Sequence, residues 1–192
     1  AVVNAAKIKP GQDVVVIGAG GVGLNAIQGA RLAGARRIVA VDLSEEKLKI
    51  AIEFGATDGV LATNSSPWKS VNEKLGGGAD AVFVSVGIPS VYDTAPLYLG
   101  AGGLVVMLGM TKSSDVSTYK PVNLAAVSQR MIGSKMGDTV IERDIPWIAD
   151  LYQQNRLKLD ELISNRWTLD QINEAIVDTK TGSAKRNLII FN

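Results

Sequence analysis

Three glycines and one aspartate carry the clearest chemical signal in this sequence. Gly18, Gly20 and Gly23 follow the pattern G-x-G-x-x-G, and Asp42 stands 19 residues after the last of them. In such a pattern the first glycine allows a tight turn out of a strand, the second lets a pyrophosphate reach the backbone, and the third lets a helix pack close to a sheet. The N–H groups and the dipole at the start of that helix attract phosphate oxygens. The pattern therefore predicts a dinucleotide site.

Asp42 indicates which dinucleotide binds. At the end of a second strand, a carboxylate accepts hydrogen bonds from the hydroxyls of the adenosine ribose and repels a 2′-phosphate, so we expect NAD rather than NADP. Asp42 is also a plausible turn residue before Ser44, and that alternative stays open. Methyltransferases that bind S-adenosylmethionine often carry an acidic residue where this sequence has Val16, and flavin proteins commonly have Glu at the place of Asp42. Both readings are therefore less favoured.

The residues usually needed for redox or hydrolytic chemistry are missing. The sequence contains no histidine and no cysteine, so it offers no Ser–His or Cys–His nucleophile system and no common zinc ligand set. We therefore predict neither a catalytic residue nor a metal ligand in this chain. Zero cysteine also fits a reducing cytoplasm.

Charge and hydropathy exclude other classes of function. Lys and Arg number 20 against 19 Asp and Glu, a balance that does not suggest nucleic-acid binding. The longest apolar stretch, 95–110, is shorter than the roughly 20 residues of a membrane-spanning helix and contains Pro96. We expect neither a nucleic acid nor a membrane as a partner.

Apolar runs alternate with helical patterns along the chain, which predicts βαβ units and a parallel sheet. We expect one doubly wound α/β domain (a Rossmann fold) over residues 1–192, with six strands and flanking helices. The strands are expected at 13–17, 38–41, 59–61, 81–86, 104–108 and 130–136, with a closing strand at 188–191. Helices are expected at 1–8, 21–33, 44–55, 67–75, 91–99, 144–154 and 169–180, and in the third of these Leu48, Ala51 and Ile52 are expected to face inward.

Longer segments carry a family resemblance. The sequence contains IKPGQDVVVIGAGGVGLNAIQGARLAGARRIVAVDLSEEKLKIAIEFGATDGV, followed in order by DAVFVSVG, GGLVVMLGM, IGSKMG and AKRNLII. Over nearly its whole length it resembles the cofactor-binding (C-terminal) domain of zinc-type medium-chain alcohol dehydrogenases. The resemblance implies an NAD(H)-binding domain of an oxidoreductase that transfers a hydride between an alcohol or polyol and NAD.

The resemblance also implies roles for single residues. The turn from Gly18 through Gly20 and Gly21 to Gly23 would hold the pyrophosphate, with Val22 behind the nicotinamide. The other implied cofactor contacts are Asp42 and Lys47 at the adenosine ribose, Leu43 and Val86 around the adenine, Gly87 at the lip of that pocket, Leu108, Gly109 and Met110 at the carboxamide with Met136 nearby, and Arg186 at the pyrophosphate. Leu43 and Val86 could instead be core residues, and Lys47 and Arg186 solvated surface charges.

The departures from the family concern whole segments. The family has an additional N-terminal, GroES-like catalytic domain that supplies the zinc ligands and most of the substrate pocket, so zinc is expected only there. We expect the isolated chain to be inactive. A stand-alone NAD-binding or dimerising module, or a fragment of a zinc-free quinone-reductase-like enzyme, are alternatives. The resemblance also predicts a homodimer that pairs through an edge strand near Arg130 to Met136.

Overall fold

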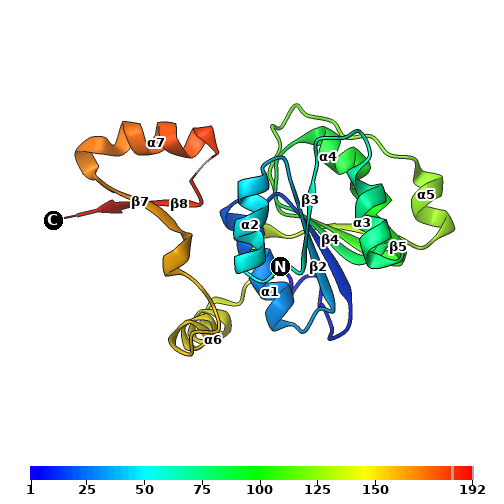
Figure 1. The fold of residues 1–192 in the computed structure, drawn as a ribbon, viewed down its shortest axis with the longest axis horizontal. Coiled ribbons are helices and arrows are strands. Elements are labelled where there is room, and N and C mark those ends of the chain that lie inside the picture. The colour runs from blue at the N-terminus through cyan, green and yellow to red at the C-terminus, as the bar shows by residue number, and fades with distance from the viewer. Residues whose placement is uncertain (183, 192) are drawn as a thin grey trace. The chain divides into compact units, whose positions relative to one another are not determined.

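A computed structural model of the chain describes residues 1–182 and 184–191. The chain divides into two compact units, Ala1–Val140 and Ile141–Asn192. Figure 1 shows the larger unit as a sheet between helices and the smaller one as helices with a short sheet. A single functional domain over 1–192 stays a prediction.

The first unit is built on a six-stranded parallel sheet. Its order is β3-β2-β1-β4-β5-β6, so the direction of winding reverses between β1 and β4. The strands are β1 (Asp13–Ile17), β2 (Arg37–Asp42), β3 (Asp58–Leu61), β4 (Ala79–Val84), β5 (Leu99–Met107) and β6 (Arg130–Gly133). All five neighbouring pairs are parallel. The predicted doubly wound fold is thus confirmed. Strand β6 is an edge strand as expected, but it ends at Gly133 rather than at Met136, which adopts a positive φ of 53°.

Helices cover both faces of this sheet, and therefore the central strands can be apolar on both sides. All five residues of β1 are buried. Figure 1 shows α1 and α2 on one side of the sheet and α3 and α4 on the other. The helical segments are α1 (Gly21–Leu32), α2 (Glu45–Glu53), α3 (Pro67–Leu75), α4 (Pro89–Thr94), η1 (Ala95–Tyr98), α5 (Pro121–Ala126) and η2 (Lys135–Asp138).

Several local predictions were wrong. Residues 1–8 form hydrogen-bonded turns rather than a helix, and Lys7 adopts a positive φ of 55° that no helix continues through. Ile52 does not face inward: it is 46% exposed, and Phe54, directly after α2, is the buried residue at that end. The strand expected at 81–86 ends at Val84, and Ser85 and Val86 belong to the following turn.

The second unit contains a sheet that the sequence did not predict. Strand β7 (Ile163–Thr168) pairs in parallel with β8 (Arg186–Ile190), the expected closing strand. The remaining elements of this unit are α6 (Ile141–Gln153), η3 (Asp160–Leu162), η4 (Leu169–Gln171) and α7 (Ile172–Thr181).

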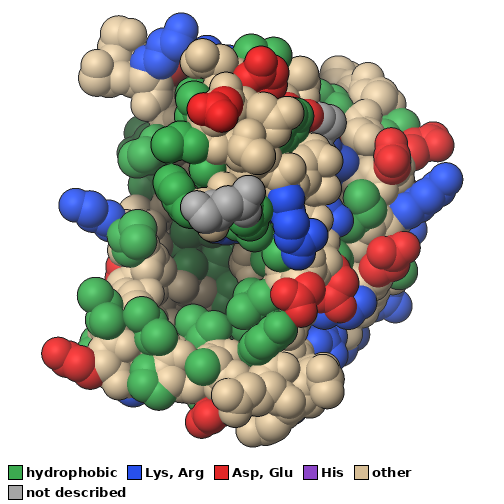
Figure 2. All heavy atoms as spheres, turned by 90° about the vertical axis from the view of Figure 1, so that its left-hand side faces the viewer, with side chains coloured by type: hydrophobic (Ala, Val, Ile, Leu, Met, Phe, Trp, Pro, Cys, Tyr) green, Lys and Arg blue, Asp and Glu red, His purple; other side chains and the backbone are tan. Residues whose placement is uncertain are grey.

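Charged side chains are mixed on the surface. On the face drawn in Figure 2, Lys and Arg are interspersed with Asp and Glu, and apolar side chains also reach the surface. Within the residues that the structure describes, no helix is both long and apolar enough to cross a membrane.

Candidate functional site

The predicted cofactor residues of the first unit meet at one edge of the sheet. In a parallel sheet the carboxyl ends of all strands lie at the same edge, which we call the carboxyl edge. Gly18–Gly23 follow β1, Asp42 ends β2, Gly87 follows β4, and Leu108–Met110 follow β5. The winding reverses between β1 and β4, and ligands of such folds bind in the crevice outside the carboxyl ends at that point.

The glycine turn has the geometry that a pyrophosphate site needs. Gly18 adopts a φ of +93°, and a Cβ on Gly23 would lie 1.8 Å from the Gly18 carbonyl oxygen, so α1 packs against the turn only because residue 23 is glycine. A Cβ on Gly20 would meet no atom within 4 Å, so the space above Gly20 is open. Gly20 is also the N-cap residue of α1.

The glycine turn also leaves backbone N–H groups without hydrogen-bond partners among the described residues. Leu24 donates its N–H to the Gly20 carbonyl at 2.8 Å. Among the described residues, no hydrogen bond engages the N–H groups of Gly21, Val22 and Gly23, as expected for the first turn of a helix. Open space and unpaired N–H groups together fit an anion such as a pyrophosphate.

Asp42 lies against this turn. Its Oδ2 accepts the Ala19 N–H at 2.7 Å and its Oδ1 accepts the Ser44 N–H at 3.0 Å. Asp42 therefore does act as a turn residue, but these two hydrogen bonds do not use all the acceptor positions of its carboxylate. A carboxylate has about four acceptor positions, so two remain for ribose hydroxyls. The half-buried Asp42 is held in place by backbone N–H groups, and no ion pair with a residue of 1–182 or 184–191 involves it.

Two further turns approach each other through their backbones. A Cβ on Gly87 would lie 2.0 Å from the Met110 carbonyl oxygen, and one on Gly109 would lie 2.3 Å from the Val86 carbonyl carbon. The N–H groups of Leu108 and Gly109 both donate to the Val84 carbonyl at 2.9 Å. Glycine is therefore required at 87 and 109 for packing, whatever either residue contributes to a ligand.

Ser85 is a site residue that the sequence analysis missed. Its hydroxyl lies 3.0 Å from the Ile17 carbonyl and 2.9 Å from the Gly18 carbonyl, so it ties the end of β4 to the glycine turn. Its signal in the sequence was a single hydroxyl residue directly after the apolar end of β4, in VFVSVG.

The apolar candidates divide into exposed and packed residues. Leu43 is 70% exposed, so its interpretation as a core residue is wrong. Val22, Met110 and Met136 are also exposed, whereas Val86 packs against the core. These exposed side chains are free to contact a ligand.

The two candidate cations are placed differently. Lys47 is half-buried on α2, where its backbone N–H donates to the Ser44 hydroxyl oxygen at 3.3 Å, and this confirms the expected cap at Ser44. Arg186 belongs to the second unit, where it begins β8 and is exposed. Cofactor contacts by either side chain stay predictions.

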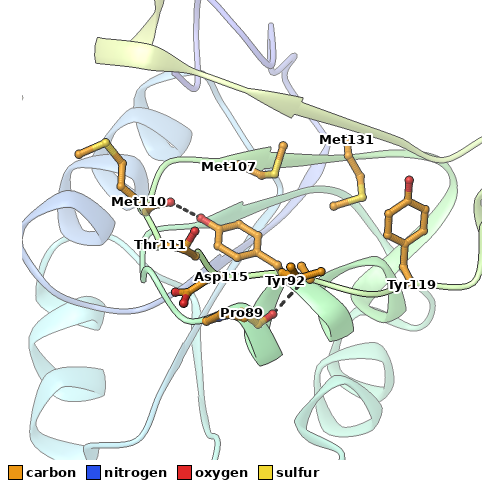
Figure 3. A pocket seen from close by; sticks show the side chains of 11 residues that line it. Pro89, Tyr92, Met107, Met110, Thr111, Asp115, Tyr119 and Met131 are labelled. Atoms are coloured by element: carbon orange, nitrogen blue, oxygen red, sulfur yellow. Dashed lines mark hydrogen bonds between the residues drawn. The ribbon is translucent and has the colours of Figure 1, made fainter. Parts of the chain in front are cut away.

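A pocket of about 560 Å³ adjoins the turn after β5. It is lined by Pro89, Tyr92, Met107, Gly109, Met110, Thr111, Asp115, Val116, Ser117, Tyr119 and Met131. Figure 3 shows the Tyr92 ring reaching toward the turn, where its hydroxyl donates to the Gly109 carbonyl at 2.5 Å. Burial raises the pKa of the Tyr92 hydroxyl, which keeps it protonated as a donor.

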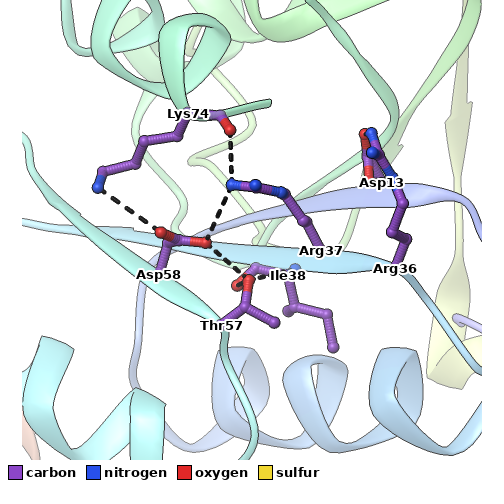
Figure 4. A network of polar contacts seen from close by, with 7 residues as sticks. All are labelled: Asp13, Arg36, Arg37, Ile38, Thr57, Asp58 and Lys74. Atoms are coloured by element: carbon purple, nitrogen blue, oxygen red, sulfur yellow. Dashed lines mark hydrogen bonds and ion pairs between the residues drawn. The ribbon is translucent and has the colours of Figure 1, made fainter. Parts of the chain in front are cut away.

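The opposite edge of the sheet, which we call the amino edge, is closed by charge pairs (Figure 4). The guanidinium of Arg36 donates two hydrogen bonds to the carboxylate of Asp13, at 3.0 and 2.5 Å. The neighbouring Asp58 faces Lys74 at 3.6 Å and Arg37 at 3.9 Å. The pKa of Arg36 is raised, first by its hydrogen bond to Asp13 and then by that residue's charge.

No metal ligand set is visible in the part of the chain that the structure describes. Residues 1–182 and 184–191 contain no group of three or more His, Cys, Asp or Glu placed to hold a metal ion. Because the sequence also lacks His and Cys, zinc does not fit this chain's own side chains.

Known proteins resemble this chain in sequence and structure. Residues 21–154 match the family described as zinc-binding dehydrogenase. An NDMA-dependent alcohol dehydrogenase from Amycolatopsis methanolica is 31% identical over 191 residues, which are 98% of this chain and 52% of that protein. The chain spans about half the length of the curated relatives it matches.

Two solved structures share the fold closely. Benzyl alcohol dehydrogenase from Acinetobacter calcoaceticus has a TM-score of 0.95 and 29% identity, covering 100% of this chain and 53% of that one. A zinc-binding dehydrogenase structure from Sinorhizobium meliloti, bound to NADP, has a TM-score of 0.87 and 27% identity, covering 98% of this chain and 55% of that one.

Proposed function

The chain belongs to the family of zinc-binding dehydrogenases, and from that premise we propose that it is the NAD(H)-binding part of an alcohol or polyol dehydrogenase. The observation that carries this proposal is the Asp42 carboxylate, fixed 2.7 Å from the Ala19 N–H beside the open space above Gly20. A carboxylate there favours ribose hydroxyls over a 2′-phosphate.

In this proposal the chain binds and orients the cofactor. The N–H groups of Gly21, Val22 and Gly23 hold the pyrophosphate, and Asp42 and Lys47 hold the adenosine ribose. Leu43, Val86 and Gly87 lie at the adenine, and Leu108, Gly109 and Met110 lie at the carboxamide of the nicotinamide. When bound, the nicotinamide accepts or gives up a hydride. The turn after β5 forms the protein wall at that end of the site.

The zinc chemistry of the family is not assigned to this chain. Alcohol oxidation needs the hydroxyl proton removed or its oxygen held by a Lewis acid. We propose that these groups come from residues outside this chain, and that the chain alone binds NAD(H) without oxidising alcohols. The check is NADH absorbance with ethanol, longer alcohols and polyols, with and without zinc. Turnover that disappears on mutating a residue of this chain would contradict it.

Calorimetric titration with NAD and NADP tests the cofactor proposal. We expect NAD to bind more tightly. Asp42→Ala should weaken NAD about tenfold through lost hydrogen bonds to a charged acceptor, and Asp42→Asn should improve NADP by removing the repulsion. Asp150→Ala, at an exposed position of α6, is the matched control and should change neither affinity. Equal or tighter NADP binding by the unmodified chain would overturn the preference.

A homodimer through β6 is part of the same proposal. Its support is that β6 ends the sheet, so its outer hydrogen-bonding groups are free to pair with a second copy. Sedimentation should show a dimer at micromolar concentration. Ile132→Pro should weaken the dimer if the N–H of residue 132 donates to β6 of the second copy. A monomer alone would contradict the pairing. We also propose a cytoplasmic location, which the lack of cysteine supports.

A further inference from the structure

We propose that Tyr92 is a positioning residue for the nicotinamide end of the cofactor, because its hydroxyl fixes the peptide group between Gly109 and Met110 and thereby aims the Met110 N–H at the ligand. This inference rests on the proposed NAD(H) site. It adds a residue on α4, outside every turn to which a cofactor contact has been assigned.

The first step is the orientation of the Gly109 carbonyl, which is set by its hydrogen bond to Tyr92. Tyr92 is 5% exposed and packs in the core between α4 and the sheet. Its hydroxyl donates to the Gly109 carbonyl at 2.5 Å, as Figure 3 shows. That carbonyl therefore points toward the buried tyrosine and away from solvent.

The second step follows from peptide geometry. The peptide bond between Gly109 and Met110 is trans, and in a planar trans peptide the C=O and the next N–H point in opposite directions. With the Gly109 carbonyl turned inward, the Met110 N–H must face outward. Met110 is 91% exposed, and no hydrogen bond among the described residues engages its N–H or the Leu108 carbonyl. Both groups are available to a carboxamide, which both donates and accepts.

The third step is that Tyr92 is the only hydrogen-bond partner of the Gly109 carbonyl among the described residues, although close packing against Val86 and Gly87 also holds the backbone of this turn. The bonds from Leu108 and Gly109 to the Val84 carbonyl hold the preceding peptides. Glycine lacks a side chain that would restrict rotation about ψ, so the Gly109–Met110 peptide can turn over if its carbonyl loses its partner. The Tyr92 hydroxyl thus decides whether a donor or an acceptor faces the ligand.

The test compares two ligands that differ by the nicotinamide. Tyr92→Phe is introduced into the 192-residue chain, which is titrated calorimetrically with NADH and with ADP-ribose. We expect NADH affinity to fall about three- to tenfold, the usual effect of one lost hydrogen bond, and ADP-ribose affinity to change less than about twofold. Tyr98→Phe is the matched control: Tyr98 is equally buried, its hydroxyl bonds to no described residue, and both affinities should stay unchanged.

A second measurement separates positioning from general damage. Replacing the carboxamide oxygen of NAD by sulfur, as in thionicotinamide adenine dinucleotide, weakens the acceptor for the Met110 N–H. The unmodified chain should prefer NAD over this analogue, and Tyr92→Phe should lose the preference. Equal weakening of NADH and ADP-ribose, or no change in either, would overturn the inference. Failure of both ligands to bind the unmodified chain would overturn the proposed function and this inference with it.

Discussion

At the amino edge of the six-stranded sheet, oppositely charged side chains pair with one another, whereas at the carboxyl edge backbone groups and hydroxyls hold the turns. Asp13 is bound by Arg36, and Asp58 lies between Arg37 and Lys74. At the carboxyl edge, by contrast, Asp42 accepts hydrogen bonds from two backbone N–H groups, and Ser85 ties two turns together.

The difference shows how one sheet serves stability and binding separately. Charged groups at the amino edge pair mainly with one another within the chain. At the carboxyl edge, neutral contacts keep the turns rigid while leaving free the N–H groups of Gly21 to Gly23 and half of the Asp42 acceptor positions. Substitutions at the two edges should therefore have different consequences.

The largest effect is expected at Gly23. In Gly23→Ala the new Cβ would lie 1.8 Å from the Gly18 carbonyl oxygen, so α1 or the turn must move. We expect the free energy of unfolding to fall by about 3 kcal/mol, as for an overpacked core site, and NAD affinity to fall at least about a hundredfold. Urea denaturation and calorimetry measure the two. Unchanged stability would show that this contact is not tight.

Gly20→Ala should separate binding from stability at the same edge. The new Cβ meets no atom within 4 Å and the φ of −80° suits alanine, so the free energy of unfolding should change by less than about 0.5 kcal/mol. The same methyl group enters the space assigned to the pyrophosphate, and NAD affinity should fall about tenfold or more. Unchanged NAD affinity would show that the pyrophosphate does not bind beside Gly20.

Asp13→Asn should show the converse at the amino edge. It removes the carboxylate charge and replaces one of the two acceptor oxygens by an NH2 donor that faces Arg36. The melting temperature should therefore drop by about 5 °C without a change in NAD affinity. Asp58→Asn is the matched comparison. Its ion pairs are longer, and the Asp58 side chain is more exposed than that of Asp13, so its melting temperature should drop by only about 1 °C. A weaker NAD affinity in Asp13→Asn would mean that the edges are coupled.

A smaller effect is expected at alkaline pH. Burial raises the pKa of Tyr98, near the start of β5, from 10.0 to about 12. Below pH 10 the hydroxyl is protonated in both folded and unfolded chains, and its contribution is constant. Above pH 10 the unfolded chain ionises first, so stability should fall as the pH rises toward 12. Melting temperatures of the unmodified chain and Tyr98→Phe measure this, and equal slopes would contradict it.

The six-stranded fold was predictable because fully buried parallel strands are continuous apolar runs, as in VVVI at residues 14–17 of β1. Strand β7 was not, because its sequence ISNRWT mixes polar and exposed residues and acquires strand structure only by pairing with β8. The glycine turn and Asp42 are close in sequence and follow a known spacing. The bond from Tyr92 to Gly109 joins residues 17 apart without any pattern, so only the structure reveals it.

The most direct test of a ligand site at the carboxyl edge is an NMR titration of the uniformly ¹⁵N-labelled chain with NAD. Amide shifts should be largest at Gly20 to Gly23, Leu43, Gly87 and Met110. Amides of the amino edge, at Asp13, Arg36, Arg37 and Asp58, should stay within the variation of the rest of the chain. Shifts of equal size at both edges, or none at the glycine turn at saturating NAD, would contradict the account.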